Sequence, residues 1–232
     1  MRDIISVGEV LIDLTQTGTT DQGIPAFAAN PGGAPANVAV AAARLGAETA
    51  FFGKVGRDSF GAYLRRVLEE NGVDCSGLRT GSQPTTLAVV SVDSRGERDF
   101  QFIRGADCTL SPEEVDEEAL GRTKFLHFGS VSLTAGLERN ATIFAARHAH
   151  RAGVLVSYDP NYRAPLWKNP EEAAQWMAIP LPLVDVIKLS EEELPLLTGT
   201  RDPEEGSRQA VLGRQNCTAT PWLTERHGYD PT

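Results

Sequence analysis

The sequence predicts an α/β protein: a doubly wound, mostly parallel β-sheet flanked by helices, with a small β lid. Apolar stretches of strand length alternate with stretches that have the helical period, which favours a parallel sheet covered on both faces. Residues 85–104 break this alternation, because they hold two apolar runs joined by a short turn with no helix between them. A small sheet of this kind can project from the body and close over a ligand.

The expected strands are apolar runs bounded by polar or glycine-rich segments. They cover residues 4–14, 49–55, 86–92, 99–103, 125–133, 154–158 and 184–189. The turn of the expected hairpin is Asp93-Ser94-Arg95-Gly96, and the glycine-rich stretch 15–30 is expected to add short strands. The lid strands are therefore expected within about residues 14–31 and 85–105.

The expected helices are marked at their ends. Pro35 suits a first helical turn, and Gly46 follows the last residue of the apolar period in 35–45. Asp58 is a typical N-cap for a helix over 58–71. Further helices are expected over residues 135–151 and near 203–212. We expect one domain over residues 1–212, and a disordered tail over 213–232, which has no hydrophobic period.

Composition narrows the possible functions. The 232 residues carry a formal net charge of −9, which disfavours nucleic acid and anionic membranes as main partners. Cys75, Cys108 and Cys217 have neither CxxC nor metal-ligand spacing, so reduced thiols in the cytoplasm are expected. No segment has the pattern of a signal peptide or a membrane span. The four histidines predict no zinc site, and His127, in an expected strand, is expected to be packed and hydrogen-bonded.

A glycine pair precedes the first expected helix in PGGAPANVAVAAARLG, residues 31–46. Gly32 and Gly33 let a ligand approach the backbone closely, where the free N–H groups of a helix start point outward. Asn37, in the first turn, offers a donor and an acceptor that suit sugar hydroxyls. A bare glycine pair before a helix would more often serve only the turn, so this inference depends on the whole run.

A second group of polar residues follows two expected strands. Asp159, Asn161 and Arg163 come after the strand ending at 158, and Lys188 lies at the end of the next one. Open α/β sheets bind ligands at the carboxyl ends of their strands. Arg163 can contact substrate or neutralise phosphate, and a surface arginine paired with nearby acids is the less favoured alternative.

These motifs resemble the ribokinase (PfkB) family of carbohydrate kinases, and most of all its fructokinases. The run 31–46, followed by FFGKVGRDSFG at 51–61, resembles the first family signature, and VGEVLIDL resembles the first strand. SYDPNYRAPLWKNPEEA (157–173) and VDVIKLSEEELPLLTG (184–199) resemble fructokinase segments. The resemblance covers about residues 4–200 and implies a ribokinase-like fold with ATP and Mg²⁺ as cofactors.

The resemblance also implies roles for single residues. Substrate-binding roles fall on Asp13, Gly32, Gly33, Asn37, Arg104, Asn161 and Arg163. Lys188, Ser190 and Glu193 are expected at the nucleotide, with Glu193 reaching Mg²⁺ through water. Lys54 is equally consistent with a place near the substrate and with a solvated surface lysine.

The second family signature, of the form DTxGAGD, is absent from the sequence. Its last aspartate is the expected catalytic base, so no residue here is assigned as catalytic. We expect a C-terminally truncated chain, with out-of-frame sequence after about Leu212 and impaired turnover.

Four interpretations follow from these observations. The first is an ATP-dependent sugar kinase acting on fructose, with 2-keto-3-deoxygluconate or another sugar left open by Arg104 and Arg163. The second is a non-catalytic sugar-binding remnant. The third, a dinucleotide-dependent oxidoreductase, is disfavoured because no GxGxxG follows the first strand. The fourth, a purely structural domain, is disfavoured by the many ligand-type residues at strand ends. A homodimer formed through the lid is also expected.

Overall fold

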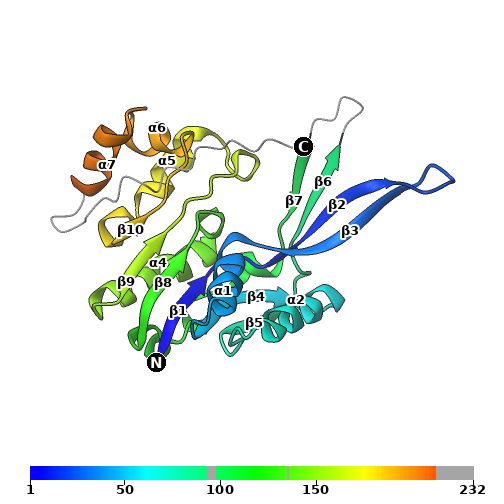
Figure 1. The fold of residues 1–232 in the computed structure, drawn as a ribbon, viewed down its shortest axis with the longest axis horizontal. Coiled ribbons are helices and arrows are strands. Elements are labelled where there is room, and N and C mark those ends of the chain that lie inside the picture. Colours follow the sequence, from blue (N-terminus) through cyan, green and yellow to red (C-terminus); the bar gives the residue numbers. More distant parts are fainter. Residues whose placement is uncertain (93–97, 135, 213–232) are drawn as a thin grey trace.

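The computed structural model describes residues 1–92, 98–134 and 136–212, which form two sheets and the helices that flank the larger sheet (Figure 1). The larger sheet has six strands in the order β10-β9-β8-β1-β4-β5, and each neighbouring pair is parallel. Its strands are β1 (Arg2–Val7), β4 (Thr49–Gly56), β5 (Leu78–Gly81), β8 (Thr123–Phe128), β9 (Leu155–Tyr158) and β10 (Val186–Ile187).

Helices cover both faces of this sheet, which confirms the predicted doubly wound fold. Alternate residues of β4 enter two separate cores: Phe51 packs with α1 and α2, whereas Phe52 lies in the cluster that contains α4 and α5. The helices are α1 (Ala34–Arg44), α2 (Ser59–Glu70), α3 (Glu117–Gly121), α4 (Gly136–Arg151), α5 (Pro170–Ala178), α6 (Glu193–Thr198) and α7 (Pro203–Leu212).

The order of the strands reverses at β1. From β1 the chain proceeds to β4 and β5 on one side, whereas β8, β9 and β10 lie on the other. Crevices at such a reversal, outside the carboxyl ends of the strands, are where open α/β sheets bind ligands.

The second sheet is the predicted lid. It contains β2 (Leu11–Thr19), β3 (Pro25–Gly32), β6 (Leu87–Val92) and β7 (Arg98–Ile103) in the order β3-β2-β6-β7. The hairpin expected over 85–104 is confirmed, because β6 and β7 pair antiparallel; its turn, 93–97, lies outside the described residues. Figure 1 shows the four strands extending away from the larger sheet.

The expected helix ends are confirmed. Pro35 occupies the first turn of α1, and Gly46 follows its end with φ +95°. The carboxylate of Asp58 accepts the N–H of Gly61 as the N-cap of α2. No helix among the residues described is long and apolar enough to cross a bilayer. The tail 213–232 lies outside the described residues.

Three strand predictions are wrong in extent. The strand expected at 125–133 ends at Phe128, and Val131–Leu133 form a short 3-10 helix. The run 4–14 was expected as one strand, but the chain leaves the larger sheet after β1 and enters the lid at β2. The link between them contains Gly8, whose φ of +145° favours glycine. In the run expected at 184–189, only Val186 and Ile187 pair with β9.

Candidate active site

Two adjoining clefts lie at the carboxyl ends of the central strands. The first, of about 370 Å³, is lined on one side by the lid and on the other by the start of α1 and the loops after β8 and β9. Five of the predicted site residues line it: Asp13, Gly33, Asn37, Asn161 and Arg163. The lid side is one face of a sheet, because alternate residues Leu11, Asp13 and Thr15 of β2 contribute to it.

Asp13 is half-buried on β2, directly opposite Asn30 of β3. Burial raises the pKa of its carboxyl, and the positive charge of Arg163 opposes this rise. Gly32 does not line the first cleft, but a Cβ at this position would collide with the Asp13 carboxylate. Gly32 therefore leaves the space in which the Asp13 carboxylate lies.

Gly33 is the N-cap of α1 and has φ +109°, a conformation that L side chains rarely adopt. A Cβ there would lie 2.5 Å from the backbone oxygen of Glu9. The N–H of Asn37 donates to the Gly33 carbonyl oxygen at 2.9 Å, which starts the helix. This geometry brings the exposed Asn37 side chain to the mouth of the first cleft.

Glu9 is a cleft residue that the sequence pattern did not single out. It is 2% exposed, and its Oε1 accepts the N–H of Ala34 at 3.0 Å. Burial raises the pKa of the carboxyl to about 7, although the Arg104 charge opposes the shift. The available signal was a charged residue between two apolar runs, which is rarely found in a buried strand.

The second cleft, of about 280 Å³, lies after β9 and β10. It holds all three residues expected at the nucleotide: Lys188, Ser190 and Glu193. Lys188 Nζ lies 3.2 Å from Asp159 Oδ2. The pKa of Asp159 is raised by burial, against the opposing charge of Lys188. A cation and hard oxygen donors thus lie together at this edge.

Asn161 and Arg163 form the boundary between the two clefts, since both residues line both clefts. Asn161 has φ +48°, and its N–H donates to Asp159 Oδ1 at 3.2 Å. Asparagine tolerates this left-handed conformation better than most residues. The DPN turn therefore orders the residues between the two clefts.

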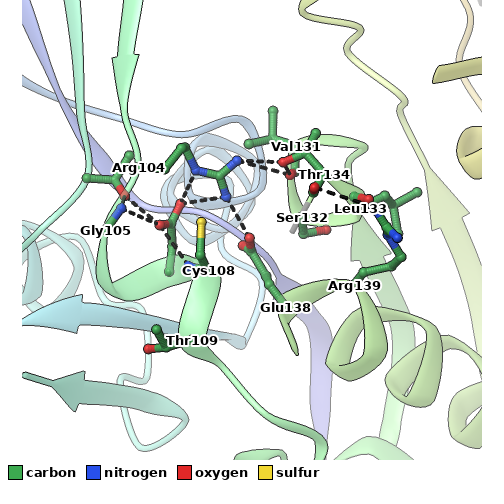
Figure 2. A network of polar contacts seen from close by, with 12 residues as sticks. Arg104, Gly105, Cys108, Thr109, Val131, Ser132, Leu133, Thr134, Glu138 and Arg139 are labelled. Carbon is green, nitrogen blue, oxygen red and sulfur yellow. Dashed lines mark hydrogen bonds and ion pairs between the residues drawn. The ribbon is translucent and has the colours of Figure 1, made fainter. Parts of the chain in front are cut away.

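Arg104 and Lys54 line neither cleft. Arg104 Nη2 lies 2.9 Å from Asp107 Oδ2 and 2.6 Å from Glu138 Oε2, in the network of Figure 2. Lys54 Nζ donates to Glu114 Oε1 at 2.8 Å. The charged groups of Lys54 and Arg104 are therefore paired with carboxylates outside these two clefts.

His127 is buried in β8 and hydrogen-bonded, as predicted. Its Nδ1 lies 3.1 Å from Ser157 Oγ, and burial lowers the pKa of the ring to about 4. His127 therefore stays neutral and serves the packing of two central strands. Cys75 and Cys108 are free thiols.

Comparison with known proteins agrees with this geometry. Residues 1–220 match the model of the pfkB family carbohydrate kinases. The chain is 44% identical over 206 residues to probable fructokinase-6, chloroplastic, of Arabidopsis thaliana, an alignment that covers 86% of this chain and 53% of that relative. The chain therefore spans about half the length of this relative.

Solved structures give the same result. The crystal structure of fructokinase from Xylella fastidiosa matches with a TM-score of 0.85 and 38% identity, covering 93% of this chain and 69% of that one. Fructokinase from the same organism with bound ATP matches with a TM-score of 0.84 and 37% identity, over 93% of this chain and 71% of that one. The chain therefore belongs to the pfkB family of carbohydrate kinases.

Proposed function

We propose that the chain binds a sugar and ATP side by side for phosphorylation of a sugar hydroxyl, and that the sugar is fructose. The observation that carries this proposal is the shared boundary at Asn161 and Arg163, which line both clefts. A ligand in the first cleft and the phosphates of a ligand in the second would meet there. Phosphoryl transfer depends mainly on such positioning and on neutralisation of charge.

The first cleft suits a polyhydroxylated ligand. Asp13 offers a carboxylate that can accept two hydroxyl hydrogen bonds, and Asn37 offers both a donor and an acceptor. Gly33 adds an approach to the backbone without a side chain in the way. Charge-assisted acceptors of this kind hold the sugar in one orientation.

The second cleft suits the phosphates of ATP. Lys188 supplies positive charge, and the Xylella fastidiosa fructokinase with bound ATP is a match over 93% of this chain. The oxygens of Asp159, Ser190 and Glu193 are the hard donors that Mg²⁺ prefers. Because the Glu193 oxygens already accept backbone N–H groups, Glu193 would hold Mg²⁺ through water. When bound, the ion neutralises the charge of the transferring phosphate.

These 232 residues contain no DTxGAGD segment and hence none of the family's expected base. We therefore propose that they bind both ligands but transfer phosphate poorly. A non-catalytic sugar-binding role is the limiting form of this proposal.

Calorimetry of the 232-residue chain with fructose and with ATP, beside a coupled assay for ADP release, tests the proposal. We expect fructose binding that Asp13→Asn weakens by about tenfold or more, and fructose-dependent ADP release close to background. Asp21→Asn is the matched control, since Asp21 is an exposed lid aspartate that lines neither cleft. A folded chain that binds no fructose contradicts the sugar site, and clear fructose-dependent turnover contradicts the impairment.

The same titrations separate fructose from 2-keto-3-deoxygluconate. A carboxylated sugar calls for a strongly cationic site, and of the two expected arginines only Arg163 lines the first cleft. We therefore expect fructose to bind more tightly. The reverse order would favour the carboxylated sugar.

We also propose that two copies of the chain pair through their lids, in the cytoplasm. Phe27 of β3 and Ile103 of β7 are exposed apolar side chains on the two edge strands of the lid sheet. Sedimentation velocity is expected to show a dimer that Phe27→Ser dissociates. Leu45→Ser, which changes an exposed leucine after α1, is the control and should leave the dimer intact.

A further inference from the structure

Arg104 directly follows the last lid strand, yet its side chain points into a buried cluster at the base of the lid rather than into a cleft (Figure 2). Only 15% of the side chain is exposed. We call its surroundings the Arg104 cluster, formed by Thr86, Arg104, Asp107, Thr134 and Glu138.

Within this cluster, Arg104 hydrogen-bonds to the part of the protein below the lid. Its Nη1 donates to Thr134 Oγ1 at 2.7 Å and to the carbonyl oxygen of Val131 at 3.3 Å, both in the loop after β8. Its Nη2 donates to Glu138 Oε2 at 2.6 Å, in the first turn of α4. The planar guanidinium thus fixes the loop and the helix in one geometry.

Asp107 holds the lid side of the same cluster. Its Oδ2 accepts Arg104 Nε at 3.0 Å, and its Oδ1 accepts the hydroxyl of Thr86, the residue before β6. Thr86 Oγ1 in turn accepts the N–H of Gly105 at 2.7 Å. The entry to β6 and the exit from β7 are therefore bound to the same carboxylate.

The cluster lies close to both walls of the first cleft. Ala88 and Phe102, which line its lid wall, are each two residues from a cluster member, Thr86 and Arg104. Val131, which lines the opposite wall, is itself a hydrogen-bond partner of Arg104. The polar cluster thus joins the two surfaces that would enclose a ligand.

Asp107, Cys108 and Glu138 also bring ligand-type atoms within 4.8 Å of one another, a spacing that would suit a metal. Arg104, however, already binds both carboxylates and supplies the positive charge at this place. Burial raises the pKa of the Cys108 thiol to about 12, which disfavours the thiolate that a metal needs. The cluster is therefore better explained as a tie between two parts of the fold.

We propose that the Arg104 cluster sets the angle of the lid against the body, and that Arg104 is a positioning residue for the sugar cleft rather than a ligand of the sugar. This inference rests on the proposed sugar site. Removing one member of this buried network leaves its hydrogen-bond partners unpaired, which favours the arrangement in which all five residues are in contact. The second cleft, beyond Asn161, does not depend on it.

Thr86→Val tests the link between lid and body, and Thr86 lines neither cleft. Valine keeps the branched shape of threonine and removes both hydrogen bonds of the hydroxyl. We expect fructose affinity to fall about threefold to tenfold, with ATP affinity within about twofold of the parent. Thr123→Val is the matched control: Thr123 is a buried threonine whose hydroxyl lies near two carbonyl oxygens at the start of β8. It should leave both affinities unchanged.

Arg104→Lys distinguishes a positioner from a ligand. Lysine keeps the charge but loses the fork, so we expect fructose and 2-keto-3-deoxygluconate to weaken by the same factor, about tenfold or more. A loss confined to the carboxylated sugar, with no effect of Thr86→Val, would overturn the proposal and make Arg104 a direct ligand. Equal losses of sugar and ATP affinity in Thr86→Val would also overturn it, because they indicate a general loss of structure.

Hydrogen exchange keeps this inference separate from the proposed function. If the parent chain binds no fructose, the proposed sugar site is wrong. Amide exchange in β6 and β7 then still tests whether the Arg104 cluster links the lid to the body. Faster exchange there in Thr86→Val than in Thr123→Val, with β8 and β9 unchanged, supports the tie. Equal exchange in the two variants contradicts it.

Discussion

The carboxylate of Glu193 accepts the backbone N–H of Tyr162 at 2.6 Å, and so joins the start of α6 to the turn after β9. Its second oxygen accepts the N–H of Ser190 at 2.7 Å. Glu193 is 4% exposed. Two loops that line the second cleft are therefore held by one buried side chain.

Glu193→Gln should destabilise the protein, because the amide group places an N–H donor against one of the two backbone donors. We expect the free energy of unfolding to fall by about 1–3 kcal/mol in urea denaturation. Glu191→Gln, at an exposed neighbouring position, should change it by less than about 0.5 kcal/mol. Similar losses in both variants would show that the two hydrogen bonds of the Glu193 carboxylate contribute nothing to stability.

Comparing Gly33→Ala with Gly46→Ala separates the cost of a steric clash from the cost of a strained backbone conformation. Both glycines have positive φ, but a Cβ at Gly33 meets the Glu9 carbonyl oxygen at 2.5 Å, whereas a Cβ at Gly46 meets nothing within 4 Å. We expect Gly46→Ala to cost about 1 kcal/mol of unfolding free energy and Gly33→Ala about 3 kcal/mol or more. Equal costs in denaturant titrations would mean that the start of α1 can shift to make room.

His127 should make stability depend on pH. Its folded pKa of about 4 lies below the ordinary value of 6.5, so the neutral ring favours the folded state above pH 6.5. That contribution, about 3 kcal/mol, is lost as the pH falls from 6.5 towards 4. Unfolding free energies of the parent and His127→Asn should therefore converge over this window.

The parent chain must be compared with His127→Asn because Glu9 changes the pH dependence of the unfolding free energy in the opposite direction. Burial raises the pKa of Glu9 to about 7, so its contribution is present below pH 4.5 and is lost as the pH rises towards 7. The parent chain alone would show the sum of both effects. A difference between parent and His127→Asn that stays constant from pH 7.5 to 4.5 would contradict the assignment.

Glu138 should tolerate amidation better than truncation. It is fully buried, and burial together with the nearby Asp107 raises its pKa well above the ordinary value, despite the charge of Arg104. Glutamine keeps the size of the side chain and an oxygen that can accept from Arg104, so we expect Glu138→Gln to cost about 1 kcal/mol of unfolding free energy. Glu138→Ala, which leaves a cavity and an unpaired Arg104, should cost about 3 kcal/mol or more. Equal losses in thermal or urea unfolding would contradict this expectation.

Local patterns in the sequence predicted the parts of the fold that local chemistry decides. Pro35 and Gly46 delimit α1, and Asp58 caps α2, because caps act within one turn of a helix. The break between β1 and β2 could not be predicted in this way. The run 4–14 is mostly apolar, with Gly8 and Glu9 between its two halves, and the positive φ at Gly8 and the pairing with other strands show that it divides between two sheets.

The candidate site shows the same limit. Asp13, Gly33 and Asn37 belong to motifs near the start of the chain, and the structure brings them to one cleft. Arg104 could not be assigned from its motif, because a ligand arginine and a buried one look alike in sequence. Its partner on the body, Glu138, is 34 residues away in the sequence, so no local pattern links the two.

The root of β2 also has a mechanical consequence. Val10 and Ile12 are buried in the same core cluster as Phe51 and Leu64, so this end of the lid is clamped in the body, whereas the Thr20–Ile24 turn is far along the strand and exposed. A strand that is packed in the core at one end moves least near that end. Asp13, one residue beyond Ile12, therefore lies where β2 is held most firmly, so its carboxylate would keep its place against the body if the outer part of the sheet moved.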